Sequence, residues 1–102
     1  MISVKRQDIL KQVKELVLKS VEKTPARIYL FGSWARGDER STSDIDIAVE
    51  PIGVVSPFLL QNLREELEES HIPYNVDVVD TREANSKLID NIMREGILWK
   101  DC

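Results

Sequence analysis

Residues 31–47 read FGSWARGDERSTSDIDI, in which an apolar run ends at a Gly-Ser pair and an Asp-x-Asp motif follows ten residues later. The apolar residues 27–31 predict a short buried strand that Gly32 stops. A glycine directly after a strand lets backbone N–H groups approach a phosphate, because no Cβ stands in the way, and Ser33 adds a hydroxyl donor. Taken alone, such a pair is typical of an ordinary turn.

Asp44 and Asp46 are the more informative half of this stretch. Residues 44–47 alternate strictly between Asp and Ile, which predicts a strand with two different faces over 44–50, and side chains two residues apart share one face. Two carboxylates on a covered face repel each other and lose solvation, so a cation is expected beside them. Carboxylate oxygens suit Mg²⁺, which also keeps waters and substrate phosphates as ligands.

An exposed polar face is the commonest explanation of an Asp-x-Asp pair on a strand. The combination with Gly32 and Ser33 at fixed spacing changes that balance, since four such residues meet by chance about once in a thousand chains of this length. The combination therefore favours a functional site.

Asp77 offers a third acid, inside the strand predicted over residues 75–80. If this strand lies beside that of Asp46, three carboxylates could surround two Mg²⁺ ions, which would hold a triphosphate and activate an attacking hydroxyl. The sequence leaves open whether the two strands are neighbours. Asp80 falls on the opposite face of its strand and is not a candidate for the same site.

The rest of the pattern predicts helices around a small sheet. Apolar residues at three- and four-residue spacing predict amphipathic helices over 7–22, 57–70 and roughly 84–95, the last stopped by Gly96 in the manner of a C-cap. A turn that could contain one helical turn is expected over 33–43, and a short last strand over 97–99. The predicted fold class is therefore α/β (α+β), with a small mixed β-sheet flanked by helices.

Composition limits the kinds of partner. The 102 residues are expected to form a single domain over 1–102, with 42% hydrophobic and 31% charged residues. The net charge of −4 and the scattered basic residues argue against a nucleic acid partner. No 18-residue apolar span or signal peptide is present, and the single Cys102 can form no internal disulfide, so we expect no membrane association and a cytoplasmic location.

The strand, the Gly-Ser pair, the ten intervening residues and the Asp-x-Asp motif together resemble the signature of the DNA polymerase β-like nucleotidyltransferase superfamily. Within it, the sequence resembles the minimal nucleotidyltransferases, or MntA-type antitoxins, from the strand at Arg27 to the helix before Gly96. The resemblance implies a polymerase β-like nucleotidyltransferase core and assigns roles to six residues. Gly32, Ser33 and Arg36 would bind the nucleotide, Asp44, Asp46 and Asp77 would hold Mg²⁺, and Asp77 would also be the general base.

The same resemblance implies the reaction. Such an enzyme would move AMP from ATP, with two Mg²⁺ ions, to a hydroxyl, that of a tyrosine, on a small helical HEPN-type toxin, and would act as the antitoxin of the pair in a hetero-oligomer. Trp34 departs from the family, in which many members carry Arg, and this departure implies a lost phosphate contact.

Two other functions remain as alternatives. The chain could be a non-catalytic binding module that neutralises its partner by contact, with the acids serving structure alone. It could also modify a small molecule or an RNA end, but its acidity and its length, which leaves no room for a second domain, argue against that. Tyr74 and Trp99 could be interface anchors, and core packing explains them equally well.

Overall fold

Four strands form one sheet in the order β3-β2-β1-β4, which confirms the predicted fold class. The structure, a computed structural model, describes residues 2–102. Its elements follow one another as α1 (Ile2–Ser20), β1 (Ala26–Phe31), α2 (Ser33–Arg36), β2 (Ile45–Pro51), α3 (Leu59–Glu68), β3 (Val76–Asp80), α4 (Ser86–Glu95) and β4 (Ile97–Asp101). None of the helices described between residues 2 and 102 combines the length and the apolar character needed to span a bilayer.

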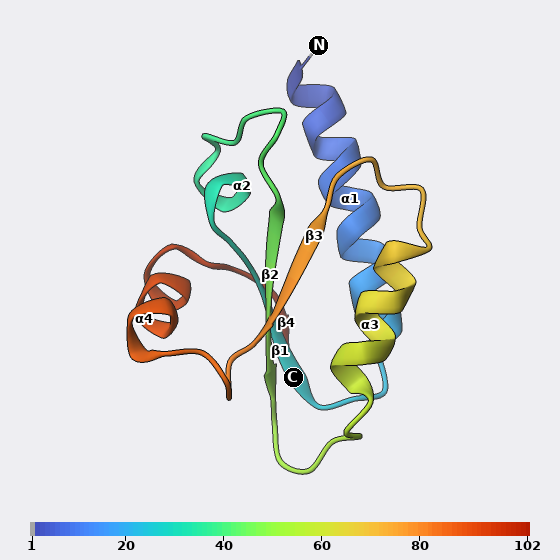
Figure 1. Ribbon diagram of the computed structural model, residues 1–102, viewed down its shortest axis with the longest axis vertical. Helices are drawn as coiled ribbons and strands as arrows, with labels where there is room; N and C mark the ends of the chain where they lie inside the picture. Colours follow the sequence, from blue (N-terminus) through green and yellow to red (C-terminus); the bar gives the residue numbers. More distant parts are fainter. Residues whose placement is uncertain (1) are drawn as a thin grey trace.

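The sheet is mixed, and its helices lie on both faces. β1 is antiparallel to β2 and to β4, whereas β2 is parallel to β3 because α3 crosses over between them. α1 and α3 cover one face of the sheet, and α2 and α4 lie on the other (Figure 1). β3 and β4 are therefore the two edge strands.

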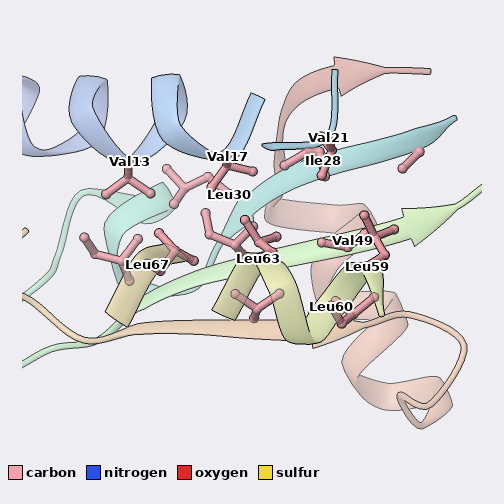
Figure 2. Close-up of a cluster of buried hydrophobic side chains, with 14 of the residues drawn as sticks. Val13, Val17, Val21, Ile28, Leu30, Val49, Leu59, Leu60, Leu63 and Leu67 are labelled. Atoms are coloured by element: carbon pink, nitrogen blue, oxygen red, sulfur yellow. The ribbon is translucent and has the colours of Figure 1, made fainter. Parts of the chain in front are cut away.

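The larger core lies between the sheet and the pair α1 and α3 (Figure 2). Val13, Val17 and Val21 recur every four residues, so they form one stripe that is fully buried against the sheet. Leu63 of α3 and Ile47 of β2 are equally buried in the same cluster. Full burial of such a side chain stabilises the fold by about 1.5–3 kcal/mol, so this face fixes the position of the strands.

The opposite face of the sheet carries a much smaller cluster under α4. Phe31, Ala48 and Ile92 are buried there, with Val79 and Leu88 packed against them. The next positions along β2 and β3 on this face, beyond Ala48 and Val79, are Asp46 and Asp77. α4 thus leaves one end of this face to polar residues.

Several predicted boundaries differ from the structure. α1 begins at Ile2 rather than at residue 7, and α3 is shorter than 57–70. The helical turn expected inside residues 33–43 is the one-turn helix α2. Gly96 ends α4, but in an extended conformation (φ −69°, ψ 144°) and not in the left-handed one usual for a glycine C-cap. The chain passes straight into β4, and a Cβ at Gly96 would collide with the carbonyl oxygen of Ile92, which explains the glycine.

Candidate active site

Residues from three strands meet at the end of the sheet that α4 leaves open. Asp46 of β2 is paired with Phe31 of β1 on one side and with Asp77 of β3 on the other. Gly32 follows Phe31 directly, and Asp44 precedes β2 by one residue, so both lie at this same end, beside α2 (Figure 1). The strands of Asp46 and Asp77 are thus direct neighbours, which the sequence had left open.

Asp46 stands at the centre of a cluster of negative charge. Its side chain is partly buried, and burial together with the nearby carboxylates of Asp77 and Asp44 raises its pKa from 3.8 to about 6. The Arg36 guanidinium acts in the opposite direction and lowers this pKa. Since the pKa is raised despite this guanidinium, burial and the two neighbouring carboxylates together outweigh its positive charge. A cation bound here would be stabilised.

Gly32 is required by the close approach of its turn to Asp46. Its backbone has φ 77° and ψ −157°, which residues with a side chain rarely adopt. A Cβ at this position would collide with Oδ2 of Asp46. Gly32 and Ser33 begin α2, whose first turn no side chain caps, so backbone N–H groups remain there for a ligand.

Arg36 lies on the same side as the acids, at the end of α2. Its guanidinium donates to Oδ2 of Asp38 at 3.2 Å and to Oε1 of Glu95 at 3.0 Å. Glu95 is in the last turn of α4, 59 residues along the chain, and the sequence analysis did not single it out because only the fold brings it to Arg36. Both ion pairs are on an exposed guanidinium, so Arg36 can exchange these partners for a phosphate at small cost.

Trp34 points away from the acids into the larger core, where its side chain is 3% exposed. Its ring packs edge-on against Tyr74, with ring centroids 5.0 Å apart, and the Arg6 guanidinium lies 5.8 Å from its centroid. Its indole N–H donates to the carbonyl of Ser43 at 3.4 Å. Trp34 therefore holds α2 and the loop before Asp44 on the core. Interface anchoring and core packing were both left open for Tyr74 and Trp99. In the structure both residues pack against the larger core.

Asp80 does not take part in the acid cluster, as predicted from the alternation of its strand. It is buried on the other face, where Arg82 donates to its Oδ2 at 2.8 Å and holds its pKa below the usual range. Asp80 is thus a structural acid with its own partner.

Among the side chains that the structure describes, no three acid, His or Cys groups already converge closely enough to enclose a metal ion. Asp44 and Asp77 are exposed and Asp46 is partly buried, so the site is open on one side. Such an arrangement suits Mg²⁺, which is usually bound by one or two carboxylates, waters and substrate phosphates rather than by a closed protein cage. The three neighbouring carboxylates fit the same ion.

A groove of about 480 Å³ leads away from the acids along β3. Asp44 and Asp77 line one part of it, and Arg64 and Leu67 of α3 line another. Arg64, which the sequence analysis did not consider, donates from Nη2 to the backbone carbonyl of Val78 at 2.8 Å. The only signal in the sequence was that Arg64 is the single basic residue of α3.

Comparison with known proteins gives consistent similarities. The family model described as Polymerase beta, Nucleotidyltransferase matches residues 11–101. The chain is 37% identical over 73 residues to the protein adenylyltransferase MntA of Shewanella oneidensis, and this covers 71% of the chain but only 52% of that relative. The chain thus spans about half the length of that protein.

Two solved structures are similar over most of the chain. A toxin–antitoxin structure with AMP-PNP superposes with a TM-score of 0.70 and 28% identity, covering 87% of this chain and 73% of that one. A tri-AMPylated Shewanella oneidensis HEPN toxin in complex with an MNT antitoxin gives a TM-score of 0.65 and 27% identity, covering 95% of this chain and 73% of that one.

Proposed function

Since the chain belongs to the polymerase beta nucleotidyltransferase family, we propose that it transfers AMP from ATP to a hydroxyl of a HEPN-type toxin and acts as the antitoxin of that pair. The observation that carries this proposal is the register in which Asp46 lies between Phe31 and Asp77, with Gly32 against its carboxylate. The similarities to MntA and to an AMPylated toxin complex support the choice of reaction and partner.

Asp44, Asp46 and Asp77 would hold Mg²⁺, and two ions are expected. Bound there, Mg²⁺ would neutralise the phosphates and lower the pKa of the attacking hydroxyl. The raised pKa of Asp46 supports this assignment, because it reflects a partly buried carboxylate with two others near it, whose ionised form a cation would favour.

The triphosphate would lie at the start of α2. Gly32 permits close approach of the backbone, Ser33 offers a hydroxyl, and the uncapped N–H groups of this turn offer further donors. Arg36 would leave Asp38 and Glu95 to bind a phosphate oxygen, for which a guanidinium has the right geometry. The similarity to a complex with AMP-PNP supports ATP as the nucleotide.

Asp77 is the acid best suited to act on the acceptor. It lies on the edge strand and is exposed, whereas Asp46 is enclosed between two strands. In the proposed step the acceptor oxygen bonds to the α-phosphorus of ATP, the bond to pyrophosphate breaks, and Asp77 takes the hydroxyl proton as general base. A tyrosine is the acceptor we favour.

The alternative is a non-catalytic module that neutralises its partner by contact. Such a module has no physical need for three neighbouring acids beside a turn that only glycine can adopt. We further propose that residues 1–102 work as a single nucleotidyltransferase domain in the cytoplasm, where ATP is available, and that they form a hetero-oligomer with the toxin.

Two radioactive labels test the proposed reaction. The purified chain is mixed with a HEPN-type protein from the same organism, Mg²⁺ and ATP labelled in either the α- or the γ-phosphate. We expect the α-label to enter the partner and the γ-label to leave with pyrophosphate. Transfer of the γ-label would indicate a kinase instead, and no transfer of either label would favour neutralisation by contact.

A further inference from the structure

The outer edge of β3 has unpaired backbone groups beside the acid cluster. β3 pairs only with β2, and the ladder is fixed at both ends by bonds from Ile45 N to Asn75 O and from Thr81 N to Val49 O. In a parallel pair, alternate residues turn their N–H and C=O groups toward the neighbouring strand. The backbone N–H and C=O groups of residues 75, 77, 79 and 81 therefore point toward β2. The backbone groups of Val76, Val78 and Asp80 point outward, away from the sheet.

Part of this edge is already occupied. Arg64 donates to the carbonyl of Val78 at 2.8 Å, and the backbone N–H of Glu83 donates to the carbonyl of Asp80 at 3.0 Å. Around Asp77, the N–H and C=O of Val76 and the N–H of Val78 remain without a neighbouring strand in the part of the chain that the structure describes. The open section of the edge is thus short and flanks Asp77.

The groove along β3 gives this section room for a ligand. Its volume of about 480 Å³ extends from Asp44 and Asp77 to Arg64, so it follows the unpaired groups and reaches the acids. Of the charged residues that line it, Asp44 and Asp77 are assigned to Mg²⁺, which leaves Glu68 and Arg64.

We propose that a short extended segment of the acceptor protein, which carries the hydroxyl residue, pairs with β3 as a fifth strand in this groove. The inference rests on the proposed function, because the transferred nucleotide needs a protein hydroxyl next to Asp77. Strand addition supplies affinity through backbone hydrogen bonds and leaves side chains to choose the substrate.

The geometry of strand pairing explains how the hydroxyl reaches the site. If the added strand runs parallel to β3, a residue that donates to the C=O of Val76 and accepts from the N–H of Val78 lies directly opposite Asp77. Its side chain then projects from the same face as Asp77 and Asp46, with Cβ about 5 Å from that of Asp77. Arg64 ends the available edge just beyond and so limits the register.

Replacement of the first residue of β3 tests this directly. Val76→Pro removes an outward N–H without removing a bond to β2, and proline is tolerated at the first residue of an edge strand. Val76→Thr is the matched control, with a similar shape and an intact N–H. We expect Val76→Pro to raise the KM for the HEPN-type acceptor about tenfold, with the KM for ATP unchanged. An acceptor KM equal to that of Val76→Thr would overturn the proposal.

Hydrogen exchange on the unaltered chain gives a second test that does not depend on the fold of a variant. Binding of the HEPN-type protein should slow exchange of the Val78 amide at least about tenfold, while the Asp77 and Val79 amides, already bonded to β2, change little. If AMP transfer occurs and the Val78 amide is unaffected, the strand-addition proposal is wrong and the proposed function stands. If no AMP transfer occurs, the proposed function is wrong, and the strand-addition proposal that rests on it is wrong as well. Slow exchange in the chain alone, increasing with its concentration, would identify a second copy as the occupant.

Discussion

Replacing Asp46 with asparagine should stabilise the protein in the absence of metal and nucleotide. Burial and the two neighbouring acids raise the pKa of Asp46 from 3.8 to about 6. The native carboxyl therefore holds its proton more tightly than the unfolded one, and the free energy of unfolding falls as pH rises from about 4 to about 6. Above that pH range, the stability that the protonated Asp46 contributes is fully lost.

The size of the stabilisation by Asp46→Asn follows from the raised pKa of Asp46. One pKa unit is worth about 1.4 kcal/mol, so the full difference corresponds to about 3 kcal/mol. Asp46 is only partly buried and water screens part of the repulsion, so we expect Asp46→Asn to gain about 1–2 kcal/mol at pH 7.5. At pH 4, where the native carboxyl of Asp46 is protonated, the gain should vanish.

Urea denaturation with EDTA at the two pH values measures this difference. Asp8→Asn, which removes an exposed carboxylate from α1, is the control and should change stability by less than about 0.5 kcal/mol. The reasoning would be refuted by an Asp46→Asn variant that is less stable than the parent protein at pH 7.5. Mg²⁺ should stabilise the parent protein more than the variant, because the variant lacks the Asp46 carboxylate that favours a bound cation.

Other substitutions test the roles of single residues. Gly32→Ala should lower AMP transfer at least about 100-fold, because a Cβ would displace the Asp46 carboxylate. Gly37→Ala is the control, because Gly37 also has a positive φ but lies in open space. This variant should retain AMP transfer and lose only about 1 kcal/mol of stability. Asp77→Asn should lower kcat by about 10²–10⁴, and titration should find the Asp46 pKa closer to its usual value. Arg36→Gln should raise the KM for ATP about tenfold and, in the same titration, raise the Asp46 pKa further. Unchanged kinetics in any of the three would remove that residue from the proposed site.

The sequence predicted the fold class and the face on which the acids lie, because both depend on local periodicity. The alternation in residues 44–47 placed Asp44 and Asp46 on one face, and the apolar spacing in α1 and α3 predicted the buried stripes. The alternation in β3 likewise separated Asp77 from Asp80.

Contacts between distant segments could not be predicted in this way. The pairing of Asp46 with Asp77 depends on the crossover through α3, and the Arg36–Glu95 ion pair depends on where α4 docks. The burial of Trp34 against Tyr74 likewise depends on how α2 turns toward the core. None of these has a signature in local spacing, because each joins residues that only the assembled sheet brings together.

Intact-mass spectrometry of the HEPN-type partner tests the central claim most directly. The partner is incubated with the chain, Mg²⁺ and each of the four nucleoside triphosphates in turn. The account predicts a mass gain of whole AMP units with ATP, and no gain when the chain carries Asp46→Asn. A stable complex in which the partner's mass never changes would contradict the account and leave neutralisation by contact as the function.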